Sequence, residues 1–106
     1  MKILIVDDEA AIRDSLDLVL RYERHETILA ANGSEALETL AEDPTIDLTV
    51  LDIKMPGTDG MDVLRTAVER QPDACIVMIS GHGTIETAVE ATRLGAFDFI
   101  EKPLDR

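Results

Sequence analysis

Six residues that could carry out chemistry follow, or close, apolar stretches of this chain. They are Asp7, Asp8, Glu9, Asp52, Ser80 and Lys102. Carboxylate oxygens are ligands that Mg²⁺ prefers, and a carboxylate can also attack a phosphoryl group as a nucleophile. A hydroxyl and an ammonium group can stabilise the oxygens of that phosphoryl group. The set therefore predicts metal and phosphoryl chemistry, provided that the fold brings its members together.

Three carboxylates in one place need a counter-charge. Two of them about 4 Å apart repel by about 4 kcal/mol at an effective dielectric of about 20. Lys102 offsets part of this repulsion, but one monovalent cation does not balance three anions. We expect Mg²⁺ rather than zinc, because the chain has one cysteine and its two histidines lie far apart in sequence.

Asp52 is then the candidate nucleophile. The cation would bridge its carboxylate and the phosphoryl oxygens, while Lys102 supplies a point charge and Ser80 donates a hydrogen bond. The sequence contains no glycine-rich P-loop that could hold a nucleotide. The phosphoryl group must therefore come from another donor.

Helix capping is the competing explanation for acidic residues after a strand. Glu9 is expected to have this role, near the positive N-terminus of the next helix. For Asp7 or Asp8 taken alone, capping and chemistry explain the sequence equally well. Capping does not explain why other strands also end in polar residues.

Apolar and amphipathic stretches alternate along the chain. Apolar runs typical of buried parallel strands occupy residues 2–6, 26–30, 46–51 and 75–80, with a last strand from Phe97 to Lys102. Helical periodicity is found at 10–23, 32–42, 58–70 and 84–94. This alternation predicts an α/β sandwich around a parallel sheet. Since ligands of such sheets bind outside the carboxyl ends of the strands, the six residues should meet at one edge.

Several helix ends can also be predicted. Asn32 is a suitable cap for the second helix, with Glu35 reaching back. Thr58 or Asp59 should cap the third helix, and Gly95 should end the fourth. The residues of the fourth helix that we expect to face the core are Ile85, Ala88 and Val89.

The composition is that of one small globular domain. The chain has 106 residues, with 22 acidic and 10 basic side chains and a formal net charge of −12. Such a charge repels phosphate backbones and anionic lipid, which argues against direct binding to nucleic acid or membrane. No signal peptide or membrane span is recognisable, and the lone Cys75 suits a reduced interior. We expect a cytoplasmic protein.

Taken together, the motifs resemble those of the receiver domain of two-component response regulators. The segments that carry the resemblance are, in order, ILIVDDE, LDIKMPGTDG, MISGHGT and FDFIEKP, and they extend over the whole chain. The resemblance implies a flavodoxin-like (CheY-like) doubly wound sheet with strand order 2-1-3-4-5. It also implies no enzyme activity apart from self-catalysed phosphoryl transfer and autodephosphorylation.

The same resemblance assigns roles to matching positions. Asp52 is the implied phosphoacceptor. The implied Mg²⁺ ligands are Asp8, Asp52 and the backbone carbonyl of Lys54, with Asp7 acting through a water. The remaining implied roles are phosphoryl contacts for Ser80 and Lys102, a rotamer switch for Phe99, and modulation of phosphoryl lifetime by Lys54 and His82.

The partners implied are a sensor histidine kinase as phosphodonor and an output module. The stretch SGHGTIETAVEATRLGAFDFIEKPLDR resembles the NtrC/NtrX group, whose receivers precede a sigma-54-activating ATPase and a DNA-binding domain. Neither domain is present in this chain. Helix 84–94 and the last strand would form the face that controls the output module, and phosphorylation would switch it.

The chain departs from the family at its end. Receivers usually continue into a fifth helix beside the first one, whereas this sequence stops at Arg106. We therefore expect apolar surface on the first and last strands and on the first helix to be uncovered. Truncation of a longer domain, or a homodimer that covers this face, would account for it.

Three other classes of protein remain as alternatives. An aspartyl-nucleophile phosphohydrolase would need a second Asp two residues after the nucleophile, where this chain has Lys54. A flavodoxin-like cofactor binder needs a Ser/Thr-rich phosphate loop, and Asp7 and Asp8 would repel the phosphate. An unphosphorylated receiver-like adaptor is excluded only in part, because the residue set is intact.

Overall fold

The computed structural model describes residues 1–55, 57–81 and 84–102. Five parallel strands form one sheet in the order β2-β1-β3-β6-β7. The strands are β1 (Lys2–Val6), β2 (Glu26–Ala30), β3 (Leu48–Asp52), β6 (Ile76–Ser80) and β7 (Asp98–Glu101). The predicted order 2-1-3-4-5 is therefore confirmed.

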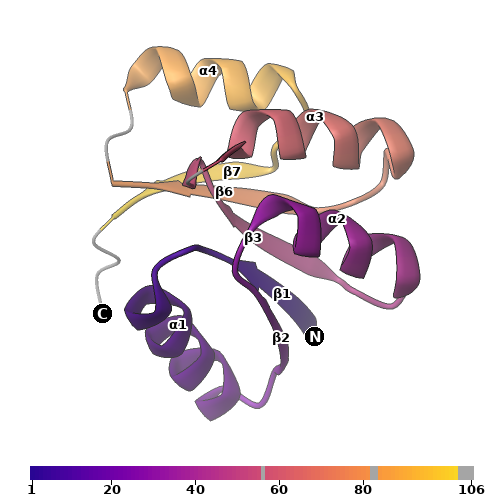
Figure 1. Ribbon diagram of the computed structural model, residues 1–106, viewed down its shortest axis with the longest axis vertical. Coiled ribbons are helices and arrows are strands. Elements are labelled where there is room, and N and C mark those ends of the chain that lie inside the picture. The colour runs from indigo at the N-terminus through magenta and orange to yellow at the C-terminus, as the bar shows by residue number, and fades with distance from the viewer. Residues whose placement is uncertain (56, 82–83, 103–106) are drawn as a thin grey trace.

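Four helices cover the sheet in the part of the chain that the structure describes. They are α1 (Ala10–Tyr22), α2 (Gly33–Glu42), α3 (Gly60–Arg70) and α4 (Ile85–Arg93). Figure 1 shows α1 on one face of the sheet and α2, α3 and α4 on the other. In the described part of the chain, no helix follows β7.

The core lies between the sheet and helices α2, α3 and α4. Leu4 and Val6 of β1 and Met78 of β6 are fully buried in it. From the opposite side it is closed by Leu64 of α3 and by Ala36 of α2. The continuous apolar runs of the strands are thus explained, because residues on both faces of a central strand are removed from water.

The predicted helix caps of α2 and α3 are confirmed. The backbone N–H of Glu35 donates to the Asn32 side chain at 2.9 Å, and the Glu35 carboxylate reaches back to the N–H of Ala31. The Asp59 side chain accepts from the N–H of Met61 at 2.9 Å. These bonds satisfy amide groups that the first helical turn leaves without partners.

A short hairpin between β3 and α3 was not predicted. It consists of β4 (Lys54–Met55) and β5 (Thr58–Asp59). Gly57 lies in its turn with φ of +73°, a conformation that glycine adopts without strain. The Pro-Gly pair predicted a break in the chain, but the hairpin pairing is too short to leave a periodic pattern.

The predicted inward face of α4 is wrong for two residues. Ile85 is 84% exposed and Val89 is 48% exposed, while Ala88 is half-buried. The buried residue of α4 is Ala91. The apolar residues of this segment are compatible with more than one helix phase, and the helix turns its small alanine toward the sheet. Gly95 ends the helix with φ of +111°, as expected.

The uncovered apolar surface agrees only in part with expectation. In α1 no residue is fully buried, and Val19 is 54% exposed. On β7, Ile100 is 42% exposed. β1, however, is almost completely buried, because it lies between β2 and β3 and beneath α1, so the expectation for the first strand is wrong. Among the described residues, no helix has the length and hydropathy of a membrane span.

Candidate functional site

Three carboxylates meet at the carboxyl edge of the sheet. Asp7 and Asp8 follow β1 and Asp52 is the last residue of β3. One oxygen atom from each carboxylate lies within 4.8 Å of the others. Asp7 and Asp52 are buried, whereas Asp8 is exposed. The edge predicted from the strand ends thus brings the acidic residues together.

Backbone hydrogen bonds beyond the strands align this edge. The N–H of Asp7 donates to the carbonyl of Ala30 at 3.2 Å, and that of Lys102 donates to the carbonyl of Ser80 at 2.7 Å. Because these bonds continue the sheet ladder past its last paired residues, the groups that follow β1 and β7 are held by backbone and not by side-chain contacts alone.

Lys102 is the cation of the cluster. Its Nζ lies 2.9 Å from Asp7 Oδ2, 3.4 Å from Asp52 Oδ1 and 3.5 Å from Glu9 Oε1. Glu9 occupies the N-cap position of α1, but its side chain makes no capping hydrogen bond. The expected capping role of Glu9 is therefore wrong, and its carboxylate lies beside Lys102 instead.

The pKa values at the site reflect burial and mutual repulsion. Burial, together with the charge of Asp7, raises the pKa of Asp52 to about 6, although the nearby Lys102 acts in the opposite direction. Burial by itself would lower the pKa of Lys102, but its close contact with Asp7 and the charge of Asp52 raise it. Lys102 is thus a permanent cation, while Asp52 is ionised mainly above pH 6.

The donor set fits a divalent cation. Asp7 Oδ2 is buried and accepts no hydrogen bond from the described residues, although the Lys102 ammonium lies close to it. That ammonium is shared with Asp52 and Glu9, so the negative charge of the cluster exceeds the positive charge beside it, and a divalent cation would balance the difference. All three carboxylates supply hard oxygen ligands, so the site suits Mg²⁺ better than a metal that prefers nitrogen or sulfur.

Ser80 lies on β6, the strand beside β3, and Phe99 lies on β7, the edge strand beyond it. Ser80 ends β6 and is buried. Phe99 lies on β7 opposite Met78, two residues before Ser80 along β6, and its half-buried ring packs against the core. His82, the other predicted modulating residue, lies outside the described residues. Its placement relative to the site stays a prediction.

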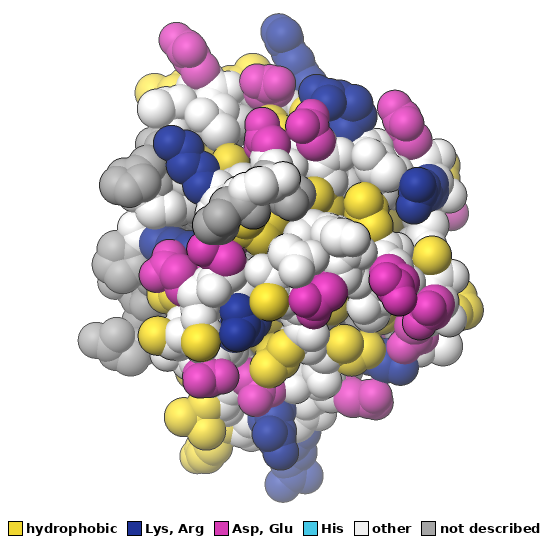
Figure 2. All heavy atoms as spheres, in the orientation of Figure 1, with side chains coloured by type: hydrophobic (Ala, Val, Ile, Leu, Met, Phe, Trp, Pro, Cys, Tyr) yellow, Lys and Arg dark blue, Asp and Glu magenta, His cyan; other side chains and the backbone are white. Residues whose placement is uncertain are grey.

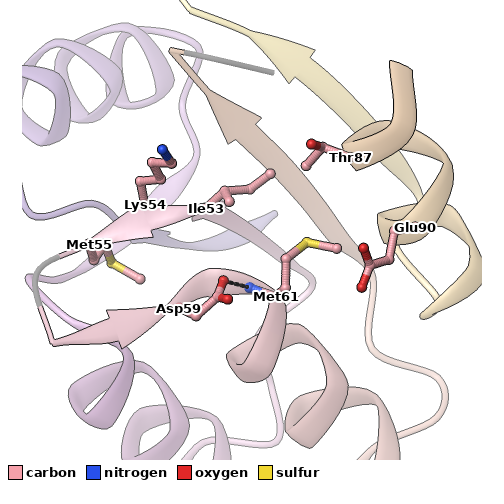
Figure 3. Close-up of a pocket in the computed structure, with 7 residues that line it drawn as sticks. All are labelled: Ile53, Lys54, Met55, Asp59, Met61, Thr87 and Glu90. Atoms are coloured by element: carbon pink, nitrogen blue, oxygen red, sulfur yellow. Dashed lines mark hydrogen bonds between the residues drawn. The ribbon is translucent and has the colours of Figure 1, made fainter. Parts of the chain in front are cut away.

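An open groove of about 710 Å³ begins directly beside the site. Ile53 and Lys54, which follow Asp52, form part of its wall. Figure 3 shows Thr87 and Glu90 of α4 facing Ile53 and Met61 across it. Helix α4 is thus separated by a groove from the segment that leaves the site.

Charged side chains are distributed broadly over the surface. In Figure 2, Asp and Glu side chains are spread over the visible face, and the Lys and Arg side chains do not gather into one patch. The described residues of this face therefore form no basic stripe of the kind that follows a nucleic-acid backbone.

Sequence reasoning missed two residues that shape this edge. Gly60 approaches the end of β3 so closely that a Cβ atom would lie 2.2 Å from the Asp52 carbonyl oxygen. Arg13 donates through Nη1 to the Asp7 carbonyl oxygen at 2.7 Å. The Asp59-Gly60 pair at the start of α3 was a possible signal for Gly60, but nothing in the spacing of Arg13 indicates its contact.

Comparison with known proteins supports the resemblance seen in the sequence. The family described as the response regulator receiver domain matches residues 3–106. An NtrX-like response regulator of Rickettsia bellii is 45% identical over 97% of this chain and 22% of its own length. PilR of Pseudomonas aeruginosa is 40% identical over 98% of this chain and 23% of its own length. The chain thus spans about a fifth of these curated relatives.

Solved structures show the same similarity. The receiver domain of NtrX from Brucella abortus is 46% identical, with a TM-score of 0.90, over 97% of this chain and 87% of that one. A beryllofluoride-activated NtrC4 receiver dimer is 36% identical, with a TM-score of 0.91, over 98% of this chain and 85% of that one. A Burkholderia pseudomallei response regulator with a phosphorylated aspartate and a calcium ion is 28% identical, with a TM-score of 0.89, over 98% of this chain and 61% of that one.

Proposed function

Because the chain belongs to the family of response regulator receiver domains, we propose that Asp52 accepts a phosphoryl group from a sensor histidine kinase. The observation that carries the proposal is the position of Asp52, buried at the end of β3 beside two other carboxylates and 3.4 Å from Lys102 Nζ. No other described carboxylate combines a strand end, burial and a neighbouring cation except Asp7, whose Oδ1 already accepts from the Glu9 N–H.

In the proposed reaction, an Asp52 carboxylate oxygen attacks the phosphorus of a phosphohistidine. The new O–P bond forms as the N–P bond breaks, and its electron pair returns to the imidazole nitrogen, which then takes a proton. At neutral pH the carboxylate is ionised, since its pKa is raised only to about 6. Lys102 and Ser80 stabilise the phosphoryl oxygens. In autodephosphorylation, water attacks the phosphorus and releases inorganic phosphate.

Asp8, Asp52 and the Lys54 carbonyl would hold Mg²⁺, with Asp7 acting through an intervening water. The ion would supply positive charge to neutralise the carboxylates and the phosphoryl oxygens. The buried Asp7 oxygen without a hydrogen bond supports this assignment. Lys54 and His82 are proposed to modulate how long the phosphoryl group survives.

Phosphorylation is proposed to act on the face formed by α4 and β7. α4 buries only Ala91, and the groove separates it from the loop after Asp52. A helix held by so few buried groups can shift at small cost, and Phe99 on β7 would move with Ser80. The chain would then be a cytoplasmic receiver domain. Its output partner would be a sigma-54-activating ATPase with a DNA-binding domain, and two receivers would pair, as in the NtrC4 receiver dimer.

The test is chemical phosphorylation. The chain is incubated with Mg²⁺ and acetyl phosphate, and its intact mass is measured. We expect the mass of one added phosphoryl group, which is absent in Asp52→Asn and in EDTA. A chain that gains no mass, or an Asp52→Asn variant that still gains it, contradicts the proposal and favours an adaptor that binds partners without being phosphorylated.

A further inference from the structure

The side chain of Arg13 reaches back from α1 to the end of β1. Its Nη1 donates to the Asp7 carbonyl oxygen at 2.7 Å, and the bond is partly buried. The backbone N–H of the same residue donates to the Glu9 carbonyl oxygen at 3.1 Å. Arg13 is thus bonded to the residue before Asp8 and to the residue after it.

Asp8 itself is held only through this turn. Its carboxylate is exposed, and within residues 1–55, 57–81 and 84–102 no hydrogen bond or ion pair is made by it. The side chains of its neighbours are engaged, since Asp7 Oδ1 accepts from the Glu9 N–H at 2.9 Å and Glu9 Oε1 lies 3.5 Å from Lys102 Nζ. The direction in which Asp8 presents its oxygens therefore depends on the backbone of the turn.

We propose that Arg13 is a positioning residue for the divalent-cation site, which it serves by fixing the turn that carries Asp8. The inference rests on the proposed function, because it requires that Asp8 binds the cation. Arg13 lies outside the carboxylate cluster and contacts a carbonyl oxygen, so it does not compete for the ligand oxygens. Groups that orient metal ligands in this way typically contribute about 10–100-fold to metal affinity.

The experiment measures Mg²⁺ binding by isothermal titration calorimetry on the 106-residue chain. Arg13→Met should bind Mg²⁺ about tenfold more weakly than the parent. The Mg²⁺ affinity of Arg13→Lys, which keeps one charged donor, should lie between those of Arg13→Met and the parent. Arg21→Met is the matched control, because Arg21 lies on the same helix and its contact is an exposed one with Asp17 at 3.6 Å. It should bind Mg²⁺ as the parent does.

A second readout separates positioning from a general loss of structure. Thermal unfolding in EDTA reports folding of each variant without the ion, and Arg13→Lys serves as the test if Arg13→Met does not fold. In acetyl phosphate labelling, Arg13→Met should need more Mg²⁺ for half-maximal rate yet approach the parental rate when Mg²⁺ saturates.

If the folded Arg13 variants bind Mg²⁺ as tightly as the parent, and the parent is phosphorylated, the proposed role of Arg13 is wrong. The role of Asp52 as the acceptor is then unaffected. A parent that binds Mg²⁺ but is not labelled contradicts the acceptor role alone. A parent that binds no Mg²⁺ contradicts both.

Discussion

The ammonium of Lys102 lies closer to Asp7 than to Asp52, at 2.9 Å from Asp7 Oδ2 and 3.4 Å from Asp52 Oδ1. Its side chain is only 11% exposed, so this contact is made with little water around it. Lys102 therefore compensates two buried carboxylates at once. In the absence of a metal ion it is the cation on which their ionised state depends.

Replacement of Lys102 by Met should destabilise the metal-free protein by about 3–5 kcal/mol, because breaking a buried ion pair leaves a charge without a partner. Urea unfolding in EDTA, followed by far-ultraviolet circular dichroism, measures this loss. Millimolar Mg²⁺ should restore part of it, since binding to the folded state alone adds stability. Lys54→Met is the control, because Lys54 is exposed and has no ion pair in the described part of the chain. A Lys102→Met loss no larger than that of the control contradicts the role of Lys102.

The raised pKa of Asp52 predicts a pH dependence of stability. Its ordinary value is 3.8, and burial together with the Asp7 charge raises it to about 6 in the folded state. The folded state therefore holds this proton more tightly than the unfolded state, so stability is lost as pH rises between these two values. Asp52→Asn removes the penalty, and without metal it should be more stable than the parent at pH above about 6, by up to about 3 kcal/mol.

The measurement is the free energy of unfolding of Asp52→Asn and of the parent, determined in EDTA across this pH range. The difference between the two free energies at each pH tests the prediction. The two proteins should have the same stability near pH 4 and diverge as pH increases. A constant difference, or one that grows toward acid, would mean that the pKa of Asp52 is not raised. Asp59→Asn provides a comparison in an exposed carboxylate that caps α3 and lies outside the cluster.

The acidic edge could be predicted from sequence because two simple regularities determine it. Continuous apolar runs mark strands such as β1 and β6, and the carboxyl ends of parallel strands meet at one edge. Asp7 and Asp52 each directly follow or end such a run, so their proximity needs no knowledge of side-chain packing. In the structure, one oxygen of each of these carboxylates and one of Asp8 lie within 4.8 Å of one another, as predicted.

Features that depend on tertiary packing could not be predicted in this way. The phase of α4 is decided by how closely the helix approaches the sheet, which selects Ala91 over the larger Ile85. Glu9 stands where a cap is expected, but Lys102 provides a charged partner from the other end of the chain. The phase of α4 and the contact of Glu9 with Lys102 both depend on segments that are distant in the sequence and meet only in the folded protein.

The observed phase of α4 makes a prediction about its two kinds of position. Ile85→Thr should change the free energy of unfolding by less than about 0.5 kcal/mol, as is usual at an exposed site. Ala91→Leu should cost about 1–3 kcal/mol, because extra methylene groups would be forced into a filled space. Urea unfolding of both variants measures these values. A large loss in Ile85→Thr with a small one in Ala91→Leu would restore the inward face expected from sequence.

Gly60 offers the sharpest test of how the hairpin is positioned beside Asp52. A Cβ atom on Gly60 would lie 2.2 Å from the Asp52 carbonyl oxygen and 2.6 Å from Ile53 Cα, both rigid backbone atoms. The N–H of Gly60 also donates to the Ile53 carbonyl oxygen at 2.6 Å. Gly60→Ala must therefore push the β4–β5 hairpin and the start of α3 away from the end of β3.

We expect Gly60→Ala to lose more than about 2 kcal/mol of unfolding free energy, a cost in the range of overpacking at a buried site. Mg²⁺ affinity should fall too, because the displaced segment carries the Lys54 carbonyl, which we propose as a ligand of the ion. Gly81→Ala is the matched control, since the nearest atom to its Cβ would be Lys102 Cδ at 3.9 Å, an ordinary contact. Urea unfolding measures the stability of the two variants, and calorimetric titration measures their Mg²⁺ affinity. If Gly60→Ala keeps parental stability and Mg²⁺ affinity, the close approach does not constrain the site.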